Sequence, residues 1–320
     1  MPKVFITTKI PDAGLNLLKE QGYELEIGSA TENLPHEEIA RRAKGADALL
    51  TQLEDRVDGN LLDGLGPQLK IVANYAVGYD NFDLKELAQR NIIATNTPGV
   101  LTEAVAEYAV GLILALFRKI PEADRFTRSG KYKGFDPDLL VGSELQGKIL
   151  GLVGHGRIGC RVAEILQKGF GMNVVYYDTK RDEAAEATCG IAYGPLEEVL
   201  SSSDVVTLHV PLLPATRHLI SEKELSSMKP SSFLVNTSRG AVIDEKALVR
   251  VLQEKKIAGA ALDVYEEEPN LAPGLSELEN VLLSPHIASA TKEAREHMAI
   301  VAASNIIAVL SGKPPLNQVK

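Results

Sequence analysis

Short runs of β-branched and apolar residues alternate with helical patterns along almost the whole chain, and this alternation limits the possible folds more than any other feature. Parallel strands need a crossover connection, which is usually a helix, so strands that alternate with helices are typical of parallel sheets covered by helices. The chain has 320 residues, about twice the size of a typical domain. The pattern therefore predicts an α/β protein with two doubly wound, parallel-sheet domains of Rossmann or flavodoxin type and a cleft between them.

The first third of the chain predicts one five-stranded unit. Helical stretches lie between its strands, for example at residues 13–20 and 36–42. The predicted strands are residues 4–7, 24–27, 48–50, 71–74 and 92–95.

A long helix over residues 101–118 then opens a second strand–helix series. Its apolar positions surround nearly the whole circumference, which indicates burial on several sides. A last helix over 292–311 has no strand after it, so we expect it to fold back onto the first unit. We predict one domain from residues 1–99 plus 288–320 and another from residues 100–287. The predicted strands of the second domain are residues 149–153, 173–177, 205–209, 233–236, 259–263 and 281–283.

Charge and composition argue against several classes of protein. The formal net charge of −9 disfavours a nucleic-acid or anionic-membrane surface, because both need a basic excess. The longest apolar run, residues 108–117, is far shorter than the ~20 residues that cross a bilayer. The N-terminus has the pattern of a strand, not of a signal peptide. Two cysteines, Cys160 and Cys189, give no disulfide framework, and no metal-ligand spacing occurs, so we expect no metal and a reducing cytoplasm.

The strongest local motif is the glycine-rich stretch Gly154-His-Gly156-Arg-Ile-Gly159. It follows an apolar strand and opens a helix, predicted over 161–168, and Asp178 ends the next strand close to the expected ~20 residues later. Such glycines permit a tight turn, close approach of the backbone to a pyrophosphate and close helix–strand contact. Asp178 can accept two hydrogen bonds from a ribose diol and repels a 2′-phosphate. The sequence therefore predicts an NAD site, while the nearby Lys180 and Arg181 leave NADP use open.

Three ionisable residues follow apolar strands of the second unit: Arg239, Glu268 and His286. Ligands bind at the carboxyl ends of strands in open α/β sheets. Singly, each residue fits a surface charge or a satisfied histidine, but the three together favour a catalytic site.

These motifs, together with Asn-Tyr-Ala-Val-Gly-Tyr-Asp-Asn at 74–81 and Asn-Thr-Pro-Gly-Val-Leu-Thr-Glu-Ala at 96–104, resemble the D-isomer-specific 2-hydroxyacid dehydrogenases over practically the whole chain. The likeness is greatest to the glyoxylate/hydroxypyruvate reductase branch. One departure is His155, where that family usually has a small or aromatic residue. It lies in the pyrophosphate loop, so we expect it to affect cofactor affinity and not the chemistry.

The resemblance implies a small 2-keto acid substrate and a role for each charged residue. His286 would be the general acid/base, and Glu268 would pair with it and raise its pKa from ~6.5. Arg239 would bind the carboxylate and polarise the carbonyl. Substrate binding would also involve His286 itself, the backbone amides of Val77 and Gly78, and the apolar side chain of Leu53. The implied cofactor-binding residues are Thr102, Gly154, Gly156, Arg157, Ile158, Gly159, Asp178, Val210, Pro211, Thr237, Ser238, Asp263, Ala288 and Ser289, with Asp263 on the nicotinamide side.

The resemblance also implies a homodimer, for which the 101–118 helix is the candidate element, although packing between domains would explain its apolar surface equally well. A non-enzymatic NAD(H)-sensing protein, similar to corepressors with this fold, is the alternative from another class; the chain lacks the extra tails expected of one. D-lactate, phosphoglycerate, phosphite and formate dehydrogenases are the rivals among enzymes. A phosphoglycerate enzyme often has a further C-terminal domain, and formate enzymes have glutamine where Glu268 stands, whereas D-lactate specificity stays open.

Overall fold

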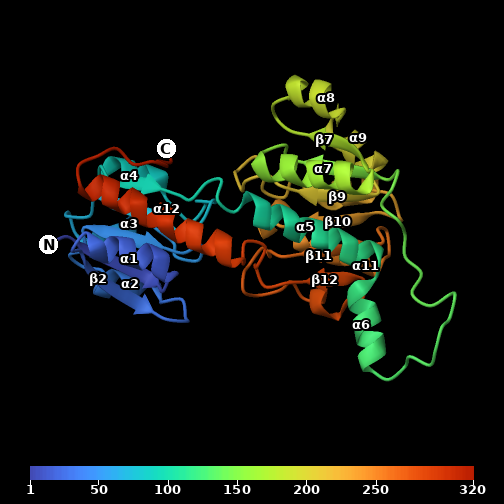
Figure 1. Cartoon of the computed structure of the whole chain (residues 1–320), viewed down its shortest axis with the longest axis horizontal. Helices are drawn as coiled ribbons and strands as arrows, with labels where there is room; N and C mark the ends of the chain where they lie inside the picture. Colours follow the sequence, from blue (N-terminus) through green and yellow to red (C-terminus); the bar gives the residue numbers. More distant parts are fainter. The chain divides into compact units, whose positions relative to one another are not determined.

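The computed structural model describes residues 1–320, which form two compact units. Unit 1 contains residues 1–101 and 290–320, and unit 2 contains residues 102–289 (Figure 1). Both are built on a parallel sheet with helices on its two faces, so the predicted α/β class with two doubly wound sheets is confirmed. None of the helices combines the length and apolar character needed to span a bilayer.

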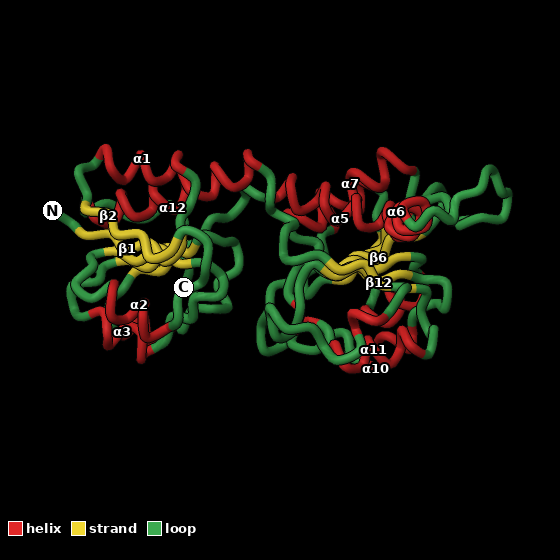
Figure 2. Tube along the Cα trace, turned by 90° about the horizontal axis from the view of Figure 1, so that it is seen from below, coloured by secondary structure: helices red, strands yellow, loops and turns green.

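Unit 1 has a five-stranded sheet in the order β2-β1-β3-β4-β5, the flavodoxin-like order. Helices α1 and α12 lie together on one face, and α2 and α3 lie on the other (Figure 2). The strands are β1 (Lys3–Thr8), β2 (Glu24–Ser29), β3 (Ala48–Thr51), β4 (Ile71–Asn74) and β5 (Ile93–Thr95). The helices are α1 (Asp12–Glu20), α2 (His36–Arg42), α3 (Gly59–Leu65), α4 (Leu84–Gln89) and α12 (Lys292–Leu310).

Unit 2 has a seven-stranded parallel sheet in the order β12-β11-β10-β9-β6-β7-β8, which is a Rossmann order with its reversal between β6 and β9. Helices α5 and α7 cover one face, and α10 and α11 cover the other (Figure 2). The strands are β6 (Ile149–Val153), β7 (Asn173–Tyr177), β8 (Ala192–Tyr193), β9 (Val205–Leu208), β10 (Phe233–Asn236), β11 (Gly259–Leu262) and β12 (Val281–Leu283). The α-helices are α5 (Thr102–Phe117), α6 (Ile120–Arg128), α7 (Arg157–Phe170), α8 (Glu183–Cys189), α9 (Leu196–Ser202), α10 (Glu222–Ser227) and α11 (Glu245–Gln253), and two short 3-10 turns cover Gly240–Val242 and Leu275–Glu277.

The central strands are apolar along their whole length because both faces of the sheet are covered. Every residue of β3, β4, β9 and β11 is buried, which explains why these strands have continuous apolar runs in place of strict alternation. The edge strand β8 has only two residues, both exposed, and this strand was missed by the sequence analysis. A two-residue edge strand carries too little pattern to be recognised.

Helix starts follow local capping chemistry. Side-chain oxygens of Asp58, Asp83, Asp182, Asp244 and Thr291 accept hydrogen bonds from first-turn amides of α3, α4, α8, α11 and α12. Helix α7 is different, because its N-cap is a glycine without a side chain. It also begins four residues before the predicted start and includes Gly159 in its first turn. The amides at this helix start are therefore not occupied by a capping side chain.

Candidate active site

The residues predicted to bind the dinucleotide and to catalyse the reaction lie at the carboxyl ends of the strands of unit 2. Because all seven strands are parallel, their carboxyl ends share one edge of the sheet. The loops after β6, β7, β9, β10, β11 and β12 carry respectively the glycine motif, Asp178, Val210 with Pro211, Thr237 to Arg239, Asp263, and His286 with Ala288 and Ser289. Thr102 begins α5 in the same unit.

The three glycines of the loop meet three different steric requirements. Gly154 has φ +99°, a conformation that L side chains rarely adopt, and a Cβ there would lie 2.8 Å from the His209 backbone. At Gly159 a Cβ would lie 2.2 Å from the Gly154 carbonyl oxygen, so only glycine lets α7 pack this closely on the loop. At Gly156, by contrast, a Cβ would meet no atom within 4 Å. The backbone at Gly156 is thus open to an incoming group.

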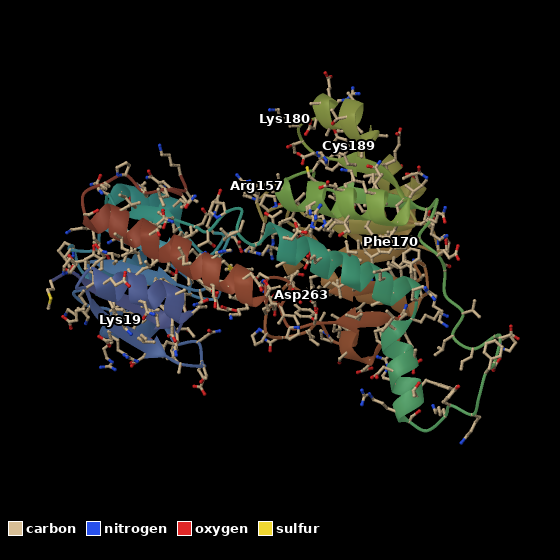
Figure 3. All side chains as sticks on the ribbon, viewed as in Figure 1. Lys19, Arg157, Phe170, Lys180, Cys189 and Asp263 are labelled. Carbon is tan, nitrogen blue, oxygen red and sulfur yellow. The ribbon has the colours of Figure 1, made fainter.

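This loop fits a dinucleotide pyrophosphate. The exposed Gly156 and Arg157 stand at the start of α7, where the first-turn amides and the helix dipole favour an anion (Figure 3). Ile158 is partly buried against the core of unit 2, which anchors the loop. Val210 lies against the loop as well, since its Cγ1 atom would be 2.9 Å from a Cβ at Gly154.

Asp178 lies directly after β7 and is held in place by the glycine loop. Its Oδ2 accepts a hydrogen bond from the His155 amide at 2.8 Å, and its Oδ1 accepts from the Lys180 amide and the Thr179 hydroxyl, both at 3.2 Å. These bonds place an acceptor-only group at the end of the second strand, where a ribose diol would donate to it.

The His155 side chain points away from the exposed face of this loop. Only 4% of the side chain is accessible, and its ring lies 4.6 Å from the Tyr176 ring. Its Nε2 is 3.2 Å from the Cys160 sulfur. The unusual residue in the motif therefore packs under the loop, and the predicted effect on cofactor affinity would have to act through the loop backbone.

His209 is a partly buried residue whose backbone lies against the glycine loop at Gly154. It follows β9, and its Nε2 lies 3.0 Å from the Thr207 hydroxyl. Burial lowers the pKa of His209 to about 3, because the charged imidazolium cannot be hydrated there. The ring is therefore neutral at physiological pH.

The turn that carries Thr237, Ser238 and Arg239 is shaped by Asn236, the buried last residue of β10. The Asn236 side chain accepts hydrogen bonds from the amide and hydroxyl of Ser238, and it donates to the Arg239 carbonyl at 2.9 Å. The Arg239 guanidinium donates to the Ser238 carbonyl. Asn236 was not among the predicted site residues.

His286 and Glu268 form a hydrogen-bonded pair. The His286 Nδ1 lies 2.8 Å from the Glu268 Oε2, while the other carboxylate oxygen accepts from the Tyr265 amide at 2.9 Å. Burial alone would raise the pKa of Glu268, but the His286 hydrogen bond and charge, the Tyr265 amide and the Arg239 charge together hold this pKa below its usual value. Glu268 is therefore a carboxylate at neutral pH, and Nε2 is the nitrogen of His286 that faces away from it.

Asp263 is fully buried and anchors the loop that carries His286. Its carboxylate accepts hydrogen bonds from the Ile287 and Ala288 amides at 2.9 and 2.7 Å and from the Ser284 hydroxyl at 2.7 Å. His286 has φ +54° within this loop, a conformation that a non-glycine residue adopts only when its surroundings hold it. A buried carboxylate with three donors supplies that restraint.

In unit 1, the predicted substrate-binding amides belong to a turn whose carbonyls all face the protein. The Ala76 carbonyl accepts from the Thr97 amide, and the Val77 carbonyl accepts from the Asn96 side chain at 2.7 Å. Because the carbonyl and the following amide of a trans peptide point in opposite directions, the Val77 and Gly78 amides point the other way. Two adjacent amides that point the same way are typical of the anion-binding turns called nests, and the turn at Val77 and Gly78 is called the nest below.

Leu53 is partly buried and lies on the neighbouring loop after β3. Two asparagines connect this loop to the nest. Asn74 donates to the Gly78 carbonyl at 2.8 Å, and Asn81 donates to the Gln52 and Asp55 carbonyls at 3.0 and 2.9 Å. The two asparagine side chains also bond to each other at 3.0 Å.

Asn74, Asn81 and Asn96 were missed as functional residues, although all three lie within the motifs that carry the family resemblance. A motif shows that asparagine stands at a position, but it does not show which carbonyl the side chain reaches.

Known proteins of one enzyme family are similar to this chain in sequence and in structure. The profile of the D-isomer specific 2-hydroxyacid dehydrogenase, NAD binding domain, matches residues 110–288. A glyoxylate reductase of Thermococcus litoralis is 49% identical over 99% of this chain and 96% of its own. A solved structure from Thermus thermophilus superposes with a TM-score of 0.93 at 42% identity, covering 99% of this chain and all of that one. An NADPH-dependent glyoxylate/hydroxypyruvate reductase of Sinorhizobium meliloti, solved with NADP and malonate, gives a TM-score of 0.86 at 34% identity, covering 99% and 96% of the two chains.

Proposed function

Because the chain belongs to the D-isomer-specific 2-hydroxyacid dehydrogenases, we propose that it reduces glyoxylate and hydroxypyruvate to glycolate and D-glycerate with NADH. The observation that carries this proposal is the His286–Glu268 pair, 2.8 Å apart, at the same sheet edge as the glycine loop. The similarity to a glyoxylate reductase over nearly the full length favours these small 2-keto acids over D-lactate or phosphoglycerate chemistry.

His286 is assigned as the general acid. Glu268 holds the Nδ1 side of the ring and stabilises the imidazolium, so Nε2 delivers the proton to the substrate carbonyl oxygen. Arg239 is assigned to polarise that carbonyl and to bind the carboxylate, for which its planar array of donors is suited. NADH, when bound, supplies the hydride.

The substrate carboxylate is also assigned to the Val77 and Gly78 amides. The carbonyls of the same two peptides, those of Ala76 and Val77, already have donors, so the peptide planes are oriented before a substrate arrives. Leu53, on the loop tied to this nest, supplies an apolar wall that suits a short side chain. Preorganised donors of this kind lose little entropy on binding.

The dinucleotide is assigned to the loop at 154–159, with Asp178 on the adenine ribose. Asp178 favours NADH over NADPH, because a 2′-phosphate would remove the diol and meet a carboxylate. The remaining predicted cofactor residues, Thr102, Thr237, Ser238, Ala288 and Ser289, lie around the same sheet edge as assigned contacts.

The proposal is tested by NADH oxidation with a panel of keto acids. Glyoxylate and hydroxypyruvate should be reduced well, pyruvate less well, and phenylpyruvate poorly. Wild-type protein should have a higher kcat/KM with NADH than with NADPH, and Asp178→Ala should narrow that gap. Rapid turnover of phenylpyruvate would contradict the small-substrate assignment. No turnover of any keto acid, with NADH still bound, would favour the NAD(H)-sensing alternative.

We also propose a homodimer and assign its interface to an arm, defined as residues 120–142. Helix α5 is covered within unit 2, where it packs against α7, β10 and β11, so its apolar surface is already used. The arm differs, because α6 has no buried residue and the following loop exposes 59% of Tyr132 and 92% of Phe135. The chain segments that flank the arm meet, because the Ser143 amide donates to the Phe117 carbonyl. Exposed aromatic side chains on a segment that leaves the body of its unit support a protein partner for the arm.

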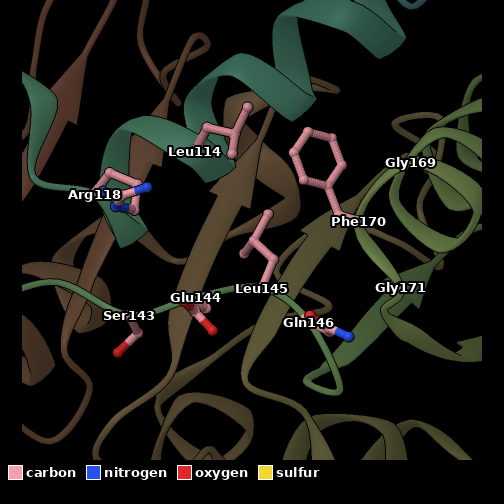
Figure 4. A pocket seen from close by; sticks show the side chains of 9 residues that line it. All are labelled: Leu114, Arg118, Ser143, Glu144, Leu145, Gln146, Gly169, Phe170 and Gly171. Carbon is pink, nitrogen blue, oxygen red and sulfur yellow. The ribbon is translucent and has the colours of Figure 1, made fainter.

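We propose that the arm of a second copy binds in a cavity that lies beside the base of the arm in this chain. It has a volume of about 500 Å³, and its apolar lining comes from Leu114, Leu145 and Phe170 (Figure 4). Arg118 and Glu144 stand at its polar side. Aromatic side chains such as Phe135 are typical anchors for an apolar pocket in an interface.

We place the protein in the cytoplasm. Cys160 and Cys189 are both free thiols, which is typical of proteins in a reducing compartment.

A further inference from the structure

The loop after β7 contains two cations, Lys180 and Arg181, beside the aspartate assigned to the adenine ribose (Figure 3 labels Lys180). A cation at this position usually favours a 2′-phosphate on the ribose. The structure shows that Arg181 already has a carboxylate partner. Its guanidinium forms two parallel hydrogen bonds with Glu186 of α8, at 2.8 Å to Oε1 and 2.7 Å to Oε2.

Two tyrosines brace this ion pair. Tyr176, which is fully buried in β7, donates from its hydroxyl to the Glu186 Oε1 at 2.9 Å, and the same hydroxyl accepts from the Asp182 amide at 2.7 Å. The Arg181 guanidinium lies 5.8 Å from the centre of the Tyr193 ring. Glu186 is only 16% exposed, whereas Arg181 is 55% exposed. The Glu186 carboxylate is therefore the fixed partner of the ion pair, and the more exposed Arg181 side chain is the one with room to move.

Arg181 is close enough to Asp178 for its orientation to matter. The Tyr193 hydroxyl lies 3.4 Å from the Asp178 carbonyl oxygen, so only one tyrosine ring separates the guanidinium from the ribose-binding strand end. The Arg181 guanidinium also holds the pKa of Glu186 below its usual value, mainly through the hydrogen bond between them. Glu186 is thus ionised whenever the dinucleotide site works at neutral pH.

We propose that Glu186 is a determinant of cofactor specificity, because it holds Arg181 in an ion pair and so denies a 2′-phosphate one of the two cations of this loop. Asp178 then disfavours NADPH by repelling its 2′-phosphate. Glu186 disfavours NADPH by keeping Arg181 paired, so that this cation does not attract the 2′-phosphate. Glu186 does not contact the cofactor in this account, so it acts through Arg181 as a positioning residue. The inference rests on the dinucleotide site proposed above.

The test uses the full-length protein and two probes that differ only in the 2′-phosphate, adenosine 5′-phosphate and adenosine 2′,5′-bisphosphate, with binding measured by calorimetry. Glu186→Gln keeps an acceptor for Tyr176 but loses the ionic hold on Arg181. This variant should bind the bisphosphate about ten- to a hundredfold more tightly than wild type, the usual gain from one hydrogen bond to a charged group. Its affinity for the monophosphate should change less than twofold.

Three further variants separate release of Arg181 from a general change of charge. Glu183→Gln removes the same charge from the same helix but leaves the ion pair intact, so it should give less than half of the gain. Arg181→Ala in the wild-type background should leave bisphosphate binding nearly unchanged. Glu186→Gln combined with Arg181→Ala should lose the gain. The NADPH to NADH ratio of kcat/KM should follow the same order in the four variants.

Three results of the binding measurements would overturn the role of Glu186 or of the dinucleotide site. Equal bisphosphate affinity in Glu186→Gln and wild type would show that the ion pair does not restrain recognition. A gain that persists without Arg181, or an equal gain in Glu183→Gln, would assign the effect to net charge. Failure of wild-type protein to bind adenosine 5′-phosphate would reject the dinucleotide site itself, and the inference with it.

Discussion

At the scale of single residues, we propose that His286 transfers the proton and that Glu268 supports it. The carboxylate is held by the Tyr265 amide and stays ionised, so it can orient the ring and stabilise its charged form. Because only His286 is assigned to move a proton, the two residues should respond differently to substitution.

His286→Ala should lower kcat by roughly a hundred- to ten-thousandfold, the usual contribution of a general acid. Glu268→Gln should retain much of the rate near neutral pH, but its reduction profile should move to lower pH, because the imidazolium loses its anionic partner. Steady-state kinetics from pH 5 to 9 would measure both effects. A nearly fully active His286→Ala together with an unchanged profile in Glu268→Gln would show that the pair is structural.

Arg239 should contribute to both binding and rate. Arg239→Ala should raise KM and lower kcat, because the assigned contacts to carboxylate and carbonyl exist in the ground and transition states. Arg239→Lys should recover only part of the loss, since one ammonium cannot replace paired planar donors. A variant with a raised KM and an unaltered kcat would limit Arg239 to substrate binding.

His209 should make folding stability depend on pH. Its pKa of about 3 lies below the ~6.5 of an unfolded histidine, so between these values the unfolded chain binds more protons. The contribution of His209 to the free energy of unfolding is therefore complete above pH 6.5. It is lost as the pH falls from 6.5 towards 3, by at most about 1.4 kcal/mol per pH unit. In His209→Asn, Tm should decrease less than in wild type when the pH is lowered from 7 to 4.5. In His297→Asn, at an exposed site, Tm should decrease as much as in wild type. Identical pH profiles for wild type and His209→Asn would disprove this assignment.

At the scale of elements, loops at strand ends are shaped by buried polar side chains that come from the strands themselves. Asn236 at the end of β10 shapes the Arg239 turn, and Asp263 after β11 anchors the His286 loop. In unit 1, Asn74 at the end of β4 and Asn96 after β5 orient the nest at Val77 and Gly78. Rigid strands thereby position backbone groups that no side-chain motif describes.

Asn96→Ala should weaken substrate binding without affecting the dinucleotide. The Val77 carbonyl loses its donor, so the peptide that carries the Gly78 amide can rotate. KM for glyoxylate should rise about fivefold, the worth of one net hydrogen bond, while the Kd for NADH stays constant. Asn60→Ala, an exposed position on α3, is the matched control. An unchanged KM in Asn96→Ala would contradict the nest assignment.

At the scale of the whole molecule, the arm leaves the aromatic side chains of Tyr132 and Phe135 exposed, and a second copy of the chain is its assigned partner. Light scattering at micromolar concentration should give twice 34.5 kDa. Replacing Tyr132 and Phe135 together by Ser should shift the mass towards 34.5 kDa, because interface anchors of this type dominate binding energy. Leu316→Ser, at an exposed apolar site outside the arm, should remain dimeric. A wild-type mass of 34.5 kDa would reject the dimer.

The sequence by itself determined the fold class, the five strands of unit 1, six of the seven strands of unit 2 and the glycine loop with its acidic partner. These features are local, because periodicity and glycine spacing are set by neighbouring residues along the chain. The two-residue β8, helix α6 and the early start of α7 were missed, since short elements and helix ends carry little pattern.

Only the tertiary structure decided which distant groups meet. The chain pattern could not show that Asn96 reaches the Val77 carbonyl, that Asp263 holds the amides after His286, or that Glu186 forms an ion pair with Arg181. Each of these contacts depends on side-chain direction and on distances between loops, which are settled by packing and not by local propensity. The predicted site residues rest on motifs and on the family resemblance, whereas the residues that orient them became visible only in the fold.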